Sequence, residues 1–242
     1  MSAAISAFRD AVLLGVAVSP FVLAALWLVG RARRIAPAAA FIVLLVLDGW
    51  LTALGADMHL NPSGLRWNWV GKLLSVALSI AVIALGPMTR SNVGLTRRQR
   101  NSGRAAVVTL GLIVLSASLL AESTRPSVET LLYQATMPGL AEELAYRGVL
   151  LWLIERALGV TEQGWSAGAL SAGFITAIAF GFWHGLGIQA GHVTFDGMAF
   201  FFPMLGGLAF WWLRRVTGSL VFPVLAHNGA NVATYLAALT RG

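Results

Sequence analysis

The stretch AVLLGVAVSPFVLAALWLVG, from Ala11 to Gly30, is 20 residues long and contains no charged side chain. A transmembrane helix needs about 20 consecutive apolar residues, because the hydrocarbon core of a bilayer is roughly 30 Å thick. The stretch is also longer than the apolar core of a cleaved signal peptide, which has about 7 to 15 residues. We therefore expect it to form a membrane-spanning helix that is not removed.

The composition of the whole chain is that of a membrane protein. Of its 242 residues, 57% are hydrophobic and 11% are charged, whereas soluble domains have about 25% charged residues. The mean hydropathy is +0.76. The chain has no cysteine, which excludes disulfides, thiolate metal sites and a cysteine nucleophile.

Apolar segments of similar length recur along the chain and predict the fold. They are Ala11 to Gly30, Pro37 to Ala56, Trp69 to Pro87, Ala105 to Ala121, Val128 to Leu158, Gly168 to Ile188, Gly197 to Leu213, and Ser219 to Leu239. They lack the alternation of barrel strands, and open sheet edges cannot face lipid. We predict an all-α fold, a polytopic transmembrane bundle of about eight helices, with an interfacial turn before Pro138 in the fifth segment.

Arginine tracts between these segments predict the orientation. One side carries Arg31, Arg33, Arg34, Arg90, Arg97, Arg98, Arg100, Arg104, Arg156, Arg214 and Arg215; the other carries Arg9, Arg66, Lys72, Arg125 and Arg241. The richer side is expected to be cytoplasmic, with both termini outside. Because the net charge of +7 comes from such tracts, we expect the lipid bilayer as a partner and no nucleic acid. The short chain, rich in Ala, Gly and Arg and without cysteine, suggests a multi-pass protein of a prokaryotic cell membrane.

The fifth segment contains MPGLAEELAYRGVLL, Met137 to Leu151, with three ionisable side chains at membrane depth. An ionisable group there costs at least about 2.5 to 3.5 kcal/mol, so it usually has a partner or a function. Glu143 lies one helical turn before Arg147, in the favourable order for an ion pair that supports the site. Glu142 is rotated by about 100° from Glu143 on an ideal helix, so we expect it to be unpaired.

Two later segments each place a pair of residues one helical turn apart. These pairs are Phe180 with His184, and His227 with Asn231. A buried Glu142 suits a general base, which with His184 would activate a water. His227 and Asn231 would donate hydrogen bonds to the oxygen that becomes negative during attack on a carbonyl. This set predicts a peptide hydrolase, whereas His59 and His192 are expected to be solvated residues of outer loops.

The motifs Glu-Glu-x-x-x-Arg, Phe-x-x-x-His and His-x-x-x-Asn, in this order in a polytopic protein, resemble those of the CAAX protease and bacteriocin-processing (CPBP) family. The resemblance covers roughly Glu129 to Tyr235. It implies a glutamic intramembrane protease that needs no cofactor or metal and acts on a membrane-associated peptide or protein, of CAAX type or a bacterial peptide. It also implies that Glu142 and His184 activate the water, that His227 and Asn231 form the oxyanion site, and that Glu143 and Arg147 support the geometry. We expect Phe180 to be a further supporting residue.

The residues leave two alternative functions open. Glu142, His184 and His227 offer one oxygen and two nitrogens, which would suit a zinc-dependent protease. A non-enzymatic bacteriocin-immunity or scaffold protein would use the same polar groups only to hold its helices together. We expect residues 1–242 to form one integral membrane domain, with helices lacking a motif in 1–127 and catalytic helices in 128–242.

Overall fold

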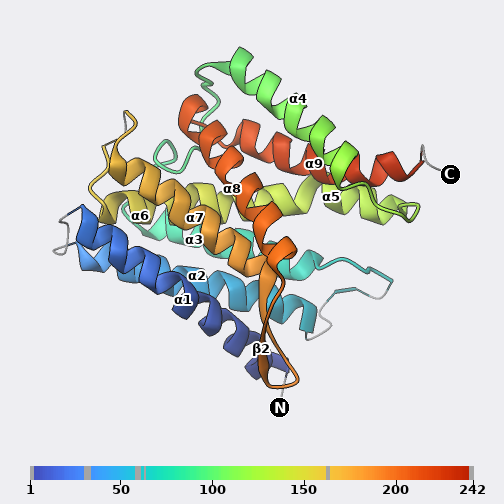
Figure 1. Ribbon diagram of the computed structural model, residues 1–242, viewed down its shortest axis with the longest axis horizontal. Coiled ribbons are helices and arrows are strands. Elements are labelled where there is room, and N and C mark those ends of the chain that lie inside the picture. Colours follow the sequence, from blue (N-terminus) through green and yellow to red (C-terminus); the bar gives the residue numbers. More distant parts are fainter. Residues whose placement is uncertain (1–2, 30–33, 58–60, 63, 162–163, 240–242) are drawn as a thin grey trace.

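The computed structural model describes residues 3–29, 34–57, 61–62, 64–161 and 164–239, which form a helical bundle (Figure 1). Its elements are α1 (Ala3–Leu28), α2 (Ile35–Asp57), α3 (Trp69–Leu85), α4 (Ser102–Leu119), α5 (Val128–Glu142), the π-helix η1 (Glu143–Leu150), α6 (Leu151–Ala157), α7 (Ala167–Gly185), β1 (Leu186–Gln189), β2 (His192–Phe195), α8 (Gly197–Thr217) and α9 (Val221–Leu239). Because α5, η1 and α6 are continuous, the described residues contain eight helical segments. The predicted all-α bundle is confirmed.

The outer surface of the bundle is suited to lipid. Within the described residues, α1, α2, α4 and α7 are long and apolar enough to cross a membrane. Large apolar side chains point outward, with Trp27 80% exposed, Leu85 89% exposed and Val107 71% exposed. In water such a surface would promote aggregation, but in a bilayer it contacts chains as apolar as itself.

The helix around Pro138 differs from the prediction. No interfacial turn precedes this proline, which lies inside α5. Proline disrupts helical hydrogen bonding, and here Asn228 of α9 binds the neighbouring backbone groups. Its Oδ1 accepts from the Gly139 N–H at 2.7 Å, and its Nδ2 donates to the Thr136 carbonyl at 3.2 Å. The predicted turn is therefore wrong, because a distant side chain satisfies the groups near the proline.

The sixth predicted helix is shorter than expected. Its helix α7 ends at Gly185 rather than at Ile188, and β1 pairs antiparallel with β2 from Leu186↔Phe195 to Gln189↔His192. Ala190 and Gly191, at φ angles of 50° and 83°, make the turn. Two consecutive residues with positive φ are typical of a tight hairpin. His192 is exposed at the start of β2, and His59 lies outside the described residues.

The continuous helix α5–η1–α6 runs through the middle of the bundle (Figure 1). Helices α2 and α3 pack against it from one side, with α1 lying on α2. On the other side, α9 packs along α5 and carries α4, while α7 and α8 pack tightly on each other. The main apolar core, which includes Val18, Phe41, Leu45, Ile154 and Phe180, joins the N-terminal helices to α6 and α7.

The described arginine tracts meet at one end of the bundle. Arg34 donates to the Arg156 carbonyl at 3.1 Å, and Arg215 pairs with Glu155 at 2.8 Å. The backbone N–H of Arg100 bonds the Thr217 carbonyl at 3.0 Å. The other tract residues Arg31 and Arg33, and Arg241, lie outside the described residues. The cytoplasmic orientation of this end stays a prediction.

Helices α7 and α8 approach closely at Gly185. A Cβ atom on this residue would lie 2.6 Å from the Asp196 carbonyl oxygen and 2.7 Å from the Phe200 nitrogen, both of which are backbone atoms. We expect Gly185→Ala to lower the free energy of unfolding by about 1 to 3 kcal/mol, because the helices must separate. Thermal unfolding of the purified protein in detergent measures the change.

Gly111 of α4 is the matched control, because an added Cβ there meets nothing within 4 Å. Gly111→Ala should leave stability unchanged or raise it by up to about 1 kcal/mol. Equal unfolding temperatures for the two variants would show that the α7–α8 contact at Gly185 tolerates a side chain.

Candidate active site

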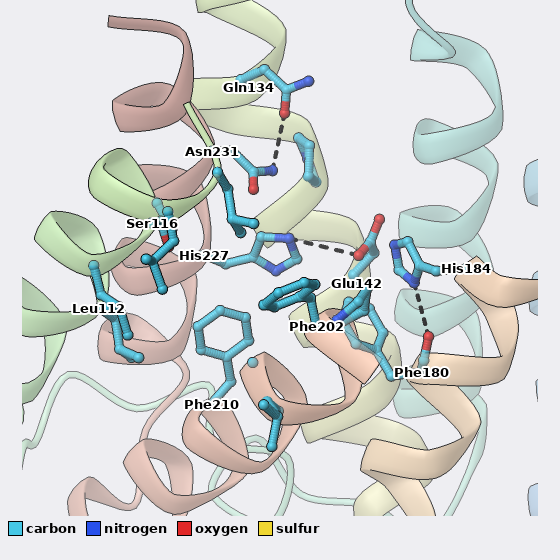
Figure 2. A pocket seen from close by; sticks show the side chains of 18 of the residues that line it. Leu112, Ser116, Gln134, Glu142, Phe180, His184, Phe202, Phe210, His227 and Asn231 are labelled. Carbon is cyan, nitrogen blue, oxygen red and sulfur yellow. Dashed lines mark hydrogen bonds and ion pairs between the residues drawn. The ribbon is translucent and has the colours of Figure 1, made fainter. Parts of the chain in front are cut away.

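A cavity of about 590 Å³ lies among α3, α4, α5, α7, α8 and α9. One part of its wall is polar and contains Lys72. Figure 2 shows the other polar residues of this part, which are Gln134, Glu142, His184, His227 and Asn231. The rest is mainly apolar, with Leu112, Leu115 and Leu119 of α4 and Phe202, Leu205 and Phe210 of α8. The cavity therefore presents an acid, an ammonium group, two imidazoles and two amides beside a large apolar surface.

The Glu-Glu-x-x-x-Arg motif lies at the junction of α5 with the π-helix η1. Glu142 is the last residue of α5, and η1 runs from Glu143 to Leu150 with every residue buried. Short π-helical turns inside α-helices are frequent at functional sites, because the wider turn redirects side chains. The sequence pattern did not predict this π-helix, although the expected pair of Glu143 with Arg147, four residues apart, still forms.

Glu142 has a partner, contrary to the prediction. Its Oε1 accepts a hydrogen bond from the Nζ of Lys72, and both residues are 8% exposed. The charge pattern of the sequence placed Lys72 on the side of the membrane with fewer basic residues. In the structure it lies in the first turn of α3 and is buried inside the bundle. Sequence-local reasoning missed this pair because the two residues are 70 positions apart. Only the packing of α3 against α5 brings them together.

The second oxygen of Glu142 is the unusual atom of the site. Oε2 is buried and has no hydrogen-bond partner within the part of the chain that the structure describes. The Nε2 of His227 lies 3.7 Å from Oε2, which is beyond hydrogen-bonding distance. Figure 2 shows this carboxylate between the rings of His227 and His184. A buried acceptor without a donor is costly, so Oε2 is suited to bind a molecule in the cavity.

Glu143 and Arg147 form the predicted ion pair behind this wall. Nη1 of Arg147 lies 3.3 Å from Oε1 of Glu143, and neither residue is exposed. The same Oε1 accepts a hydrogen bond from Nδ1 of His227 at 2.8 Å. The guanidinium of Arg147 also stacks over the Phe180 ring at 4.5 Å. The pair thus anchors His227 and Phe180 to η1.

The hydrogen bonds of the two histidines define their proton positions. Nδ1 of His184 lies 2.8 Å from the Phe180 carbonyl, and a carbonyl only accepts, so this nitrogen carries a hydrogen. Its Nε2 is then an acceptor when the ring is neutral. Nδ1 of His227 likewise donates to Glu143, so Nε2 of His227 donates only when the ring is doubly protonated. The adjacent carboxylate of Glu143 stabilises that imidazolium.

Asn231 points its amide toward α5. Its Nδ2 donates to Oε1 of Gln134 at 3.0 Å, as Figure 2 shows. An amide nitrogen carries two hydrogens, so one hydrogen remains for a molecule in the cavity. Phe180, predicted as a supporting residue, makes T-shaped ring contacts with both histidines. The centroid of its ring lies 4.6 Å from that of His184 and 6.0 Å from that of His227. Phe210 stacks on His227 at 5.1 Å.

The structure brings the predicted residues to one place. Glu142, Phe180, His184, His227 and Asn231 line the same cavity, and Glu143 and Arg147 lie directly behind it. Sequence reasoning missed Lys72, Gln134, Asn228 and Phe210. For Lys72 a signal was present, because Lys72, Ser75 and Ser79 fall on one face of an apolar helix at helical spacing.

The zinc alternative needs a close cluster of ligands. Among the described residues, no group of three or more His, Asp or Glu side chains is arranged to hold a metal ion. Glu142 and His227 come near each other, with the oxygen and nitrogen 3.7 Å apart. The described residues add no third ligand to this pair in the present arrangement.

The site places a carboxylate beside two histidines inside a lipid-exposed helical bundle, an arrangement that suits acid–base chemistry at membrane depth. A comparison with known protein families gives one match. Residues 123–233 match the family described as type II CAAX prenyl endopeptidase Rce1-like. Over these residues the match confirms the resemblance to the CPBP family, and it supports a CAAX-type intramembrane protease in general. No curated protein and no solved structure matches the chain.

The anchoring role of Glu143 is open to test by substitution. Glu143→Gln leaves the fully buried Arg147 without its carboxylate and weakens the bond to His227. Removing one partner of a buried ion pair costs about 3 to 5 kcal/mol, so a large drop in the free energy of unfolding is expected. Glu155→Gln breaks the pair with Arg215, in which the Glu155 side chain is 21% exposed, and should cost clearly less because water reaches this carboxylate. Similar unfolding temperatures in detergent for both variants would contradict the anchoring role of Glu143.

Proposed function

We propose that this protein is a glutamate-dependent intramembrane endopeptidase, which hydrolyses a peptide bond in a membrane-associated peptide or protein without a cofactor. The observation that carries the proposal is the buried Oε2 of Glu142, an acceptor without a donor among the described residues, at the wall of a cavity that His184 and His227 also line. We also propose that the chain is a single multi-pass domain of a prokaryotic cell membrane, with its catalytic helices in residues 128–242.

Glu142 and His184 would activate the water. A water bound between Oε2 of Glu142 and Nε2 of His184 would donate a hydrogen bond to each acceptor. Oε2 would take one proton as the water oxygen forms a bond to the carbonyl carbon, whose π electrons move to the carbonyl oxygen. General base catalysis of this kind contributes about 10² to 10⁴ in rate.

His227 and Asn231 would stabilise the resulting oxyanion. Nε2 of His227, in the doubly protonated ring, and the second amide hydrogen of Asn231 would donate to the negative oxygen. Glu143 supports this state because it accepts from Nδ1 of the same ring. When the tetrahedral intermediate collapses, the carbon–nitrogen bond breaks and the proton held by Glu142 passes to the departing amine.

The apolar part of the cavity suggests what lies beside the scissile bond. Leu112, Leu115 and Leu119 of α4 face Phe202 and Leu205 of α8 across it. A substrate with a long apolar group near the cleaved bond, such as a lipidated CAAX-type peptide or an apolar bacterial peptide, would bury that group there. The hydrophobic gain is about 25 cal/mol for each Å² removed from water.

The first test measures cleavage of candidate membrane peptides, including a prenylated CAAX peptide, in detergent. Wild type and Glu142→Gln are compared with and without a zinc chelator. We expect chelator-resistant cleavage by wild type and a loss of about 10²-fold or more in Glu142→Gln, because the amide cannot accept the proton. Equal cleavage by both proteins would contradict the mechanism, and chelator sensitivity would favour the zinc-dependent alternative.

Asn231 offers a second test of the same site. We expect Asn231→Ala to lower kcat by about 10²-fold, the usual effect of removing one oxyanion donor, with little change in KM. Ser118→Ala is the control, since within the described part of the chain this exposed hydroxyl bonds only the Val114 carbonyl of its own helix. A rise in KM with an unchanged kcat would assign Asn231 to substrate binding instead.

A further inference from the structure

We propose that Lys72 is a positioning residue for Glu142, supplied to the active site by the N-terminal helices. It binds one carboxylate oxygen and leaves the other directed at the water. This inference rests on the proposed function, because it assigns a role relative to Glu142 as the base. It concerns a residue outside the segment 123–233 that matches the protease family.

The contact itself distinguishes the two oxygens of Glu142. Nζ of Lys72 bonds Oε1, while Oε2 has no donor within the described residues. The side chains of both residues are 10% exposed, and both line the cavity. A carboxylate held at one oxygen cannot rotate without breaking its bond to the ammonium. Oε2 therefore keeps one direction relative to His184 and His227.

Charge balance supplies the second argument. Glu142 and Glu143 are adjacent in the sequence and both buried, with exposures of 8% and 0%. Arg147 pairs with Glu143, and Lys72 pairs with Glu142. A buried carboxylate without a cation favours its neutral form, and a neutral carboxylic acid cannot take a proton from water. Lys72 thus maintains the state in which Glu142 acts as a base.

The contact between α2 and α3 holds Lys72 in place. Oδ1 of Asn68 caps α3 by accepting from the Gly71 N–H at 3.0 Å, and its Nδ2 donates to the Thr52 carbonyl at 2.8 Å. One turn after Lys72, Ser75 donates to the buried Asp48 at 2.5 Å. These bonds, before and after Lys72 in the sequence, determine the position of α3 along its axis and its rotation relative to α2. The N-terminal helices therefore form the support of this cation.

The test compares Lys72→Met, Lys72→Arg and Ser79→Ala with wild type in the peptide-cleavage assay. We expect Lys72→Met to lower kcat by about 10²-fold, within the range of general base effects, with KM changed less than about twofold. Lys72→Arg should retain most of the activity because it restores a cation. Ser79 is buried on the same face of α3 but does not line the cavity, so Ser79→Ala should behave like wild type.

Glu142→Gln, assayed in parallel, separates the two proposals. If Glu142→Gln is inactive and Lys72→Met keeps the wild-type kcat, the role of Lys72 is overturned and the glutamic mechanism stands. If Glu142→Gln cleaves as well as wild type, the proposed function itself fails. A change confined to KM, or equal losses in Lys72→Met and Lys72→Arg, would also overturn the positioning role. Lys72→Gln replaces Lys72→Met if the latter does not fold, because it removes the charge but keeps a donor.

Discussion

Two adjacent carboxylates buried in a membrane bundle are the constraint on which the rest of the structure depends. Glu142 and Glu143 each need a cation, because the desolvation of an unpaired charge costs several kcal/mol. Arg147 serves Glu143 from the same helix, and Lys72 serves Glu142 from α3. The second pair forms only if α3 lies against α5. The N-terminal helices are therefore coupled to the site by electrostatics as well as by apolar packing.

The polar cluster and the apolar chamber come from different parts of the fold. The central helix α5–η1–α6 carries the acids and the arginine, α7 and α9 bring the histidines, and α4 and α8 form most of the apolar wall. The close approach of α7 and α8 at Gly185 fixes the end of the helix that bears His184. Asn228 of α9 binds backbone groups beside Pro138, which ties α9 to α5 just before Glu142. Both connections position the site without lying in it.

Much of the fold could be predicted because each membrane helix must satisfy its own backbone in lipid. The segments found by apolar length reappear with most ends shifted by four residues or fewer, whereas α1 begins at Ala3, eight residues before the predicted start at Ala11. The hairpin Leu186–Phe195 replaced the expected last turn of the sixth helix. The π-helix η1 and the unbroken passage through Pro138 depend on neighbours in space, so no pattern within the segment could reveal them.

The order and spacing of Glu142, Glu143, Arg147, Phe180, His184, His227 and Asn231 were determined by the sequence alone, and so was the resemblance to a protease family. The ion pair of Glu143 with Arg147 was also accessible, because both residues lie on one helix. Only the tertiary structure decided that Glu142 is paired with Lys72, that its buried Oε2 has no donor among the described residues, and that His227 is bound by Glu143. The physical reason is that these contacts join different helices, and their register is set by side-chain packing over the whole bundle.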